Sequence, residues 1–332
     1  MLPARTTCTD NLEAPVIRPR PVLALLAVLL AAAPAQACGA CGCTLNGDWA
    51  SQGIATRPGF RFDLRFDAFT QDQLRSGTRT VDPASLPLPN GQEVQRSTAN
   101  RNLTLTLDWS PSAAWGLSLQ APAYWRNHET VAAGDGDPSF SRSTGLGDVR
   151  LVGRYQGFLD DFSLGVQAGL KLPTGRYHDT FATGPQAGEP VDRGLQPGTG
   201  TTDLLLGLYK FGDLGMTWGW FAQAMLQLPL NKREDFRPGR AVNANAGLRY
   251  GGLGPVTPQL QLNVRAEQRE SGTAADVANS GATLVYLSPG LTADLGRGVQ
   301  AYAFIQVPVH QRVNGLQLEP RSSVSVGLHV AF

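Results

Sequence analysis

The sequence has few cysteines, no excess of charge of one sign, and no long apolar run after its first 37 residues. Its net charge is +1, from 28 Lys and Arg against 27 Asp and Glu, so a nucleic-acid partner, which usually requires a basic excess, is not expected. Four cysteines in 332 residues exclude a fold built on a framework of disulfides. The missing apolar run excludes a transmembrane helix, which needs about 20 such residues.

The first 37 residues have the pattern of an export signal. An apolar run at 21–37 follows Arg18 and Arg20 and ends in the small residues Ala35-Gln36-Ala37, which a signal peptidase recognises. We therefore predict a signal peptide with an extended leader at 1–37, a Cys-rich periplasmic N-terminal segment at 38–57 and one further domain at 58–332. The segment 38–57 is too short for a large plug, but it could dip into a lumen.

The chain after the signal alternates apolar and polar residues along many segments. In the last one, 324–332, Val, Val, Leu, Val and Phe occupy every second position. Side chains alternate faces along a β-strand, so each segment is a strand with one apolar face. About twelve such segments of roughly ten residues follow one another, and ten residues is the length of a tilted membrane-spanning strand. We predict an all-β fold, a transmembrane antiparallel up-and-down β-barrel of about 12 strands in a bacterial outer membrane.

The connections between these segments alternate between short and long. Outer-membrane barrels have tight turns on the periplasmic rim and long loops on the outer rim, and an even strand count places both chain ends in the periplasm. The predicted short turns are 110–113, 158–161, 212–215, 251–255 and 293–298, and the predicted long loops are 71–100, 128–144, 175–199, 231–240, 268–280 and 311–320.

If the apolar residues face lipid, the residues between them face a narrow lumen. An Arg or Lys facing hydrocarbon at mid-depth would cost roughly 2–4 kcal/mol. Eight basic and five acidic residues in this set predict a mild preference for anionic or polar solutes. An equally good interpretation is that Arg–Asp pairs only brace the wall. The predicted lumen-lining residues are Arg61, Asp63, Arg65, Asp67, Asp108, Arg126, Asp148, Arg150, Arg154, Lys171, Arg249, Arg265 and Glu267.

Three cysteines, Cys38, Cys41 and Cys43, open the predicted mature chain. Thiolates favour soft metal ions such as copper(I) or zinc, although no histidine is nearby to complete the site. A disulfide with one remaining thiol is a second interpretation in an oxidising periplasm. Lipid attachment at Cys38 is a third interpretation, although the residues before Cys38 differ from the Leu-small-small run that lipoprotein signals usually have. These alternatives stay open, and no other cofactor is predicted.

Three short motifs lie at 145–151 (GLGDVRL), 170–175 (LKLPTG) and 198–204 (GTGTTDL). They resemble the meta-pathway phenol-degradation family of outer-membrane, transporter-like barrels. The resemblance extends over most of the predicted barrel, and its motifs describe strands and loops rather than a catalytic site. It implies a barrel that passes hydrophobic or aromatic compounds. The Cys-rich opening is not part of that pattern.

We therefore expect an outer-membrane channel or transporter for small solutes, and not an enzyme. The main alternative is a metal-linked or structural barrel without an open pore. A barrel phospholipase is the competing enzyme, and it needs a Ser and a His within hydrogen-bond reach. No serine stands out beside any of the four histidines. Expected partners are outer-membrane lipid, small solutes, and the barrel-assembly machinery, through the C-terminal strand that ends at Phe332.

Overall fold

The computed structural model describes residues 45–54 and 57–332. The predicted signal peptide and the cysteines Cys38, Cys41 and Cys43 lie outside the described residues. Among the described residues, no helix has the length and apolar character needed to cross a membrane. The elements are β1 (Gly59–Gly77), β2 (Arg79–Thr80), η1 (Pro83–Ser85), β3 (Val94–Ser110), β4 (Trp115–Val131), β5 (Ser139–Leu146), β6 (Val149–Tyr155), β7 (Leu164–Leu172), β8 (Phe181–Thr183), η2 (Arg193–Leu195), β9 (Asp203–Leu214), β10 (Trp218–Pro229), β11 (Ala241–Tyr250), β12 (Val256–Glu267), β13 (Ala282–Gly296) and β14 (Val299–Ala331).

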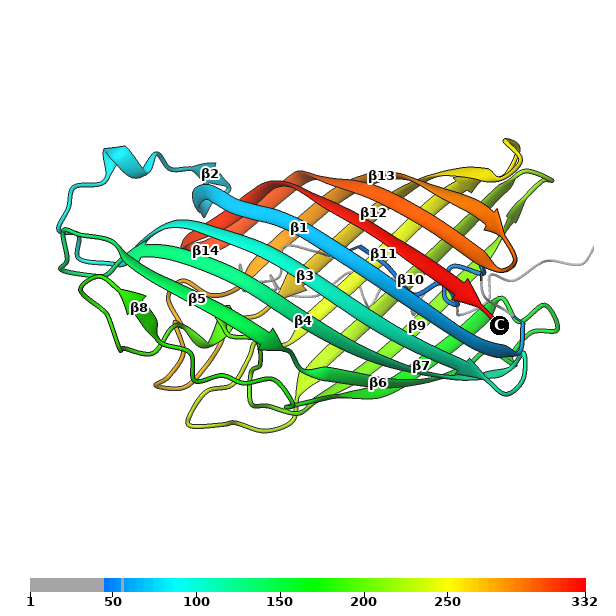
Figure 1. The fold of residues 1–332 in the computed structure, drawn as a ribbon, viewed down its shortest axis with the longest axis horizontal. Coiled ribbons are helices and arrows are strands. Elements are labelled where there is room, and N and C mark those ends of the chain that lie inside the picture. Colours follow the sequence, from blue (N-terminus) through cyan, green and yellow to red (C-terminus); the bar gives the residue numbers. More distant parts are fainter. Residues whose placement is uncertain (1–44, 55–56) are drawn as a thin grey trace, which may run out of the picture. The chain divides into compact units, whose positions relative to one another are not determined.

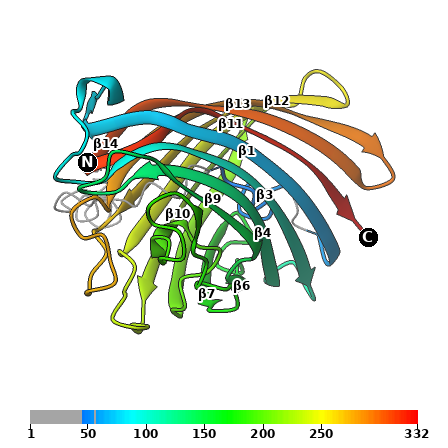
Figure 2. The ribbon, with the colours of Figure 1, turned by 60° about the vertical axis from the view of Figure 1, so that its left-hand side comes forward.

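Eleven of these strands close into an antiparallel ring. The order is β1, β3, β4, β6, β7, β9, β10, β11, β12, β13 and β14, and β14 pairs with β1 to close it. In Figures 1 and 2 the strands run obliquely around the barrel, with β9 to β12 on the wall behind β1, β3 and β4. Strands β2, β5 and β8 lie outside the ring. The prediction of an all-β, antiparallel barrel is confirmed.

The last element, β14, supplies two passes of the barrel. Its part 299–313 pairs with β13, and its part 313–331 pairs with β1. Two hydrogen bonds show that the two parts lie side by side. Gln306 Nε2 donates to Ser323 Oγ at 2.9 Å, and Gln311 Nε2 donates to the Pro320 carbonyl at 2.9 Å. Gly315, with φ of +54°, lies where the element turns back, a conformation that glycine adopts readily. Counted by passes, the ring therefore has the twelve strands that the alternation predicted.

The outer wall carries an apolar belt. Leu107, Leu119, Leu248, Leu262 and Val326 are each 39–46% exposed, and an apolar patch that runs around a barrel is typical of a lipid-facing surface. At one end of the belt, aromatic rings pair across neighbouring strands. These pairs are Phe60–Trp109, Trp115–Tyr155 and Trp218–Tyr250, with ring centroids 6.1, 4.7 and 4.9 Å apart. They match the aromatic girdle of membrane barrels.

The short connections lie at the same end as the C-terminus, which we call the turn end; the opposite end is the loop end (Figure 1). Three predicted loops are wrong in extent. Strand β1 continues to Gly77, β3 begins at Val94, and β4 and β5 extend into 128–144. The segment 311–320 is strand with a tight turn, so short and long connections do not alternate strictly. Above a lipid belt a strand can be polar on both faces while its backbone ladder continues, so polarity alone does not mark a loop.

The belt predicts a cost for charge on the outer wall. Leu262, near the middle of β12, faces outward, so Leu262→Arg should lower the free energy of unfolding by roughly 2–4 kcal/mol. Urea titration of the barrel folded into lipid vesicles measures this. Leu262→Ala is the control for lost side-chain volume. Equal stability of the Arg and Ala variants would contradict a lipid-facing belt.

Candidate functional site

The barrel encloses a cavity of about 360 Å³. Toward the turn end it is lined by residues 45–50, which precede the first strand, and toward the loop end by residues 193–199 of the β7–β9 connection and by Phe236 and Pro238 of the next connection. The barrel wall forms its sides. The cavity therefore lies between two segments that enter the barrel from opposite ends.

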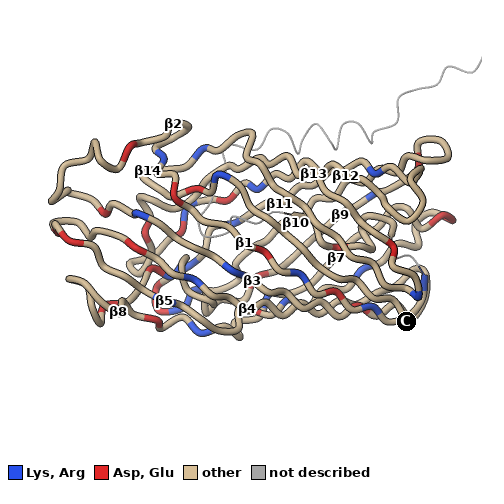
Figure 3. Tube along the Cα trace, turned by 45° about the horizontal axis from the view of Figure 1, so that its top comes forward, with Lys and Arg blue, Asp and Glu red and all other residues tan. Residues whose placement is uncertain are grey.

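Most of the charged residues that the sequence placed in the lumen line this cavity. Arg154 is buried next to it, bonded to Asp108, and Arg249 lines a second recess, which also includes Ile54 and Trp218. Figure 3 shows basic and acidic positions interspersed along the strands as well as in the connections. The predicted residues that line the cavity are Arg61, Asp63, Arg65, Asp67, Asp108, Arg126, Asp148, Arg150, Lys171, Arg265 and Glu267.

Most of the wall charges neutralise one another across or along strands. Asp108 on β3 accepts from Arg61 on β1 at 2.6 Å and from Arg154 on β6. Arg65 pairs with Asp67 at 3.0 Å, and Arg265 pairs with Glu267. Ion pairs in a partly dehydrated interior compensate the cost of removing each charge from water. These pairs brace the wall.

Residues 45–54, the plug segment, cross the barrel interior. The Trp49 indole nitrogen donates to Asp63 at 2.8 Å, and the Tyr302 hydroxyl donates to the other oxygen of Asp63 at 3.0 Å. The Trp49 ring lies 4.9 Å from the ring of Tyr302 and 5.2 Å from that of His329. Trp49 is thus held by a carboxylate and two rings on β1 and β14.

Other contacts of the plug segment reach strands around the ring. Asp48 accepts from Gln167 on β7 at 2.5 Å, and the Gln52 carbonyl accepts from Arg249 on β11. Gly53, with φ of +74°, packs so closely on β9 that a Cβ there would lie 2.4 Å from the Phe211 ring. No residue of the plug segment belongs to a ladder of the sheet. The plug segment is therefore held in the lumen by side-chain packing and by hydrogen bonds that do not extend the sheet.

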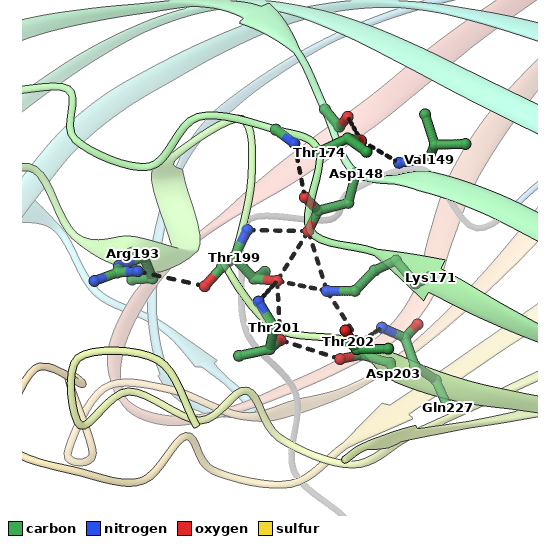
Figure 4. A network of polar contacts seen from close by, with 12 residues as sticks. Asp148, Val149, Lys171, Thr174, Arg193, Thr199, Thr201, Thr202, Asp203 and Gln227 are labelled. Carbon is green, nitrogen blue, oxygen red and sulfur yellow. Dashed lines mark hydrogen bonds and ion pairs between the residues drawn. The ribbon is translucent and has the colours of Figure 1, made fainter. Parts of the chain in front are cut away.

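The β7–β9 connection, residues 173–202, folds inward at the loop end; we call it the inner loop. Lys171 at the end of β7 lies between Asp148 and Asp203, at 3.1 Å from each (Figure 4). Asp148 also accepts from the Gly175 and Thr199 amides, both at 3.0 Å, and from the Thr199 hydroxyl at 2.9 Å. This network joins the two ends of the inner loop to the barrel wall.

The three motifs that carried the family resemblance meet in this network. Asp148 belongs to the first motif, Lys171 and Gly175 to the second, and Thr199 and Asp203 to the third. Their glycines allow the backbones to touch: a Cβ on residue 198 would lie 2.3 Å from the carbonyl of residue 175. The motifs therefore specify how the inner loop is anchored, which no single motif indicates.

The anchored loop places Arg193 over the cavity. Its guanidinium lies 4.2 Å from the Tyr177 ring centroid and 5.3 Å from that of Phe236, and it pairs with Glu234 at 2.8 Å. Rings and a carboxylate together hold the cation in one position. Arg193 was absent from the predicted lumen set. Residues 45–54 belong to the segment that the sequence indicated could dip into a lumen, but none of their side chains was identified as lining it. Arg193 follows a turn-rich stretch, so strand alternation gave no sign of its inward position.

Three carboxylates from different connections meet at the loop end. The carboxylate oxygens of Glu93, Asp192 and Asp276 lie within 4.8 Å of one another, and these form the one group of metal-type ligands found among residues 45–54 and 57–332. The Thr130 hydroxyl donates to Glu93 at 2.6 Å. Burial, with the charges of Asp192 and Asp276, raises the pKa of Glu93 to about 7. Burial and Asp276 raise the pKa of Asp192 to about 6.

The histidines are dispersed. His128 is buried on β4 with its Nδ1 2.8 Å from the Thr98 hydroxyl, and His329 lies 3.9 Å from Asp63. His178 is exposed in the inner loop and His310 is exposed on β14. Within the described part of the chain, none of them is hydrogen-bonded to a serine hydroxyl.

No family model matches the chain, and no curated protein matches it. Its fold is similar to solved outer-membrane barrels. An outer membrane channel from Pseudomonas putida F1 gives a TM-score of 0.62 at 14% identity, covering 87% of this chain and 99% of that one. The P. putida toluene transporter TodX gives 0.45 at 10% identity, covering 87% and 95%. The translocator domain of the autotransporter NalP from Neisseria meningitidis gives 0.47 at 9%, covering 85% and 92%. At these identities the similarity shows the fold alone.

The network of Figure 4 predicts the effect of removing its cation. Lys171→Met leaves two buried carboxylates facing each other, so it should lower the free energy of unfolding by about 3–5 kcal/mol and make the inner loop sensitive to protease. Heat-dependent migration on gels and limited proteolysis measure these effects. Lys232→Met removes an exposed lysine that pairs at 3.2 Å with Asp235 and should change neither. Unchanged stability of Lys171→Met would show that the network does not anchor the loop.

The raised pKa values predict that the contact between the three connections weakens with pH. An acid whose pKa is higher in the folded state adds stability at low pH, and this stability is lost as the pH rises through about 6–7. Amide exchange in the connections around Glu93 and Asp192, corrected for intrinsic rates, should be faster at pH 8 than at pH 5.5. Glu93→Gln should shrink this difference, whereas Glu189→Gln, at an exposed residue of the inner loop, should leave it unchanged. A difference that persists in Glu93→Gln would contradict the assignment.

Proposed function

We propose that the chain is an outer-membrane channel in which small solutes pass through the central cavity, with the turn end in the periplasm. The observation that carries the proposal is the cavity itself. A barrel that served only as a brace could fill its interior with side chains, whereas this one keeps about 360 Å³ of space lined by charged groups. The fold supports the outer-membrane location, because it is similar to solved outer-membrane channels.

We propose that this structure is a closed state of the channel. We propose that the plug segment is the gate on the turn side. Its contacts with the wall are side-chain packing and hydrogen bonds, and it forms no ladder with the wall, so it can leave without disturbing the sheet. The Asp63 contacts of Trp49 and Tyr302 are its principal latch. The second candidate function is a barrel without an open pore, and the presence of the plug segment inside the barrel favours it equally. Whether the plug segment can leave and open the pore distinguishes the two functions.

The chemistry of the lining limits the solute. Ionised side chains from β1, β6, β7 and β12 favour a solute with a polar or charged group. Apolar side chains such as Phe69, Tyr124, Val152 and Phe236 also line the cavity and favour an apolar body. A purely hydrophobic compound would leave the charges without partners. The hydrophobic or aromatic solutes implied by the family resemblance therefore fit best when they carry a polar group.

Two earlier expectations remain proposals. The soft-metal site at Cys38, Cys41 and Cys43 concerns residues outside the described ones, immediately before the plug segment in sequence. Recognition by the barrel-assembly machinery rests on the C-terminal strand. The amide of Phe332 donates to the Phe60 carbonyl at 2.9 Å, where the barrel closes. Its aromatic side chain is 82% exposed and is therefore accessible for recognition.

The latch predicts how the channel opens. A hydrogen bond to a charged group contributes about 1.5–3 kcal/mol, so Trp49→Ala should raise the open probability in planar bilayers by about tenfold or more. Trp125→Ala, which removes an exposed indole from the outer wall on β4, is the matched control and should behave as the parent. A Trp49→Ala protein that is folded but as silent as the parent would favour the barrel without a pore.

A further inference from the structure

One cation of the cavity wall differs from the others. Arg150 on β6 lines the cavity and is half-buried. Among the residues that the structure describes, it has no ion pair or hydrogen bond through its side chain. By contrast, carboxylates pair with Arg61, Arg65, Lys171, Arg193 and Arg265, and Arg126 donates to Asn100 at 2.7 Å.

The sheet explains why Arg150 has no counterion. Its neighbours across the ladder are Gln120 on β4 and Lys171 on β7, so neither is an acid. The acid two residues away on the same face, Asp148, already accepts from Gly175, Thr199 and Lys171. Three of these bonds reach Oδ2 and one reaches Oδ1, so the carboxylate is held toward the inner loop and Lys171. It forms no ion pair with Arg150.

An unpaired guanidinium in a partly dehydrated cavity is a binding group for an anion. Removing a charge from water is unfavourable unless a partner compensates it. The planar fork of arginine matches a carboxylate with two parallel hydrogen bonds, which a lysine cannot reproduce. Arg150 is thus complementary to a carboxylate that enters the cavity.

The surroundings of Arg150 favour an organic acid over an inorganic anion. Val152, the next residue on the same face of β6, and Pro122 and Tyr124 on the adjacent β4 line the same cavity. The Tyr124 ring lies against Gly147, where a Cβ would be 2.2 Å from it, so glycine permits the position of the ring. These apolar groups and the cation together suit a carboxylate attached to a small apolar body.

We propose that Arg150 is the solute-binding residue of the cavity and that it selects small organic carboxylates. This inference rests on the proposed channel function and names the solute class of the same cavity. The solute would bind with its carboxylate at Arg150 and its apolar part toward Val152 and Tyr124. Passage then requires the plug segment to leave on the turn side.

Reversal potentials in planar bilayers test the inference. Gradients of potassium benzoate and of potassium chloride are applied to the full chain, in the parent and in the Trp49→Ala background. Arg150→Gln should lower the chloride-to-potassium permeability ratio by about threefold, the effect of one unit charge ~6 Å from the ion in a water-like medium. The benzoate ratio should fall further, because benzoate also loses the two parallel hydrogen bonds from the guanidinium. Arg150→Lys should restore the chloride ratio but restore the benzoate ratio only in part.

The control is Arg142→Gln, which removes the same charge from the exposed face of β5 and should leave both ratios unchanged. Heat-dependent gel migration confirms that each variant is folded. Equal benzoate ratios in Arg150→Gln and its parent would overturn the role of Arg150 while the channel function stands. Equal losses for benzoate and chloride would overturn the carboxylate selectivity. No current in either background would overturn the channel function and this inference with it.

Discussion

The closure of the sheet through β1 and β14 is the interaction on which the other features depend. In hydrocarbon, every backbone amide and carbonyl needs a partner within the protein, and an antiparallel ring provides one without leaving an edge. The ladder runs from Arg61 opposite Ala331 to Gly77 opposite Val313. Once it forms, alternation sends one set of side chains outward to lipid and the other into a confined interior.

Confinement determines what the inward set can do. A charge inside the barrel must find an opposite charge, a hydrogen bond or a solute, because little water is available. Asp108 serves two arginines and Lys171 serves two aspartates, so the charges are shared rather than matched one to one. Such sharing holds the wall and the inner loop in place. It also leaves Arg150 without a partner, which is how a structural network can create a binding group beside it.

Much of the fold could be predicted from the sequence, because strand alternation is a local property. The pattern at 324–332 or 60–68 shows directly which side chains share one face of a strand, and the number of such segments gives the number of passes. The extent of the loops could not be predicted this way. Residues 311–320 have no lipid-facing apolar stripe, because Leu316 and Leu318 are buried with Leu74 and Val94, yet they remain in the ladder because both neighbouring strands continue beyond the belt. Local polarity carries no information about such pairing.

The site was less accessible to prediction for a related reason. Alternation identifies inward charges such as Asp148 and Lys171 but not their partners, which lie 23 to 51 residues away along the chain. The glycine-containing motifs at 145–151, 170–175 and 198–204 were the available signal for these partners. That the three motifs meet in space could be seen only in the structure. The plug segment has no periodicity, so its residues could be recognised only from contacts made by Trp49 and Asp48.

The position of Phe332 has a consequence for biogenesis. Its amide donates to the Phe60 carbonyl at the beginning of β1, so the seam joins two strands that lie far apart along the chain. Until β14 pairs with β1, the sheet has an open edge at each border. The barrel can therefore close only after β14 has been synthesised and has reached β1.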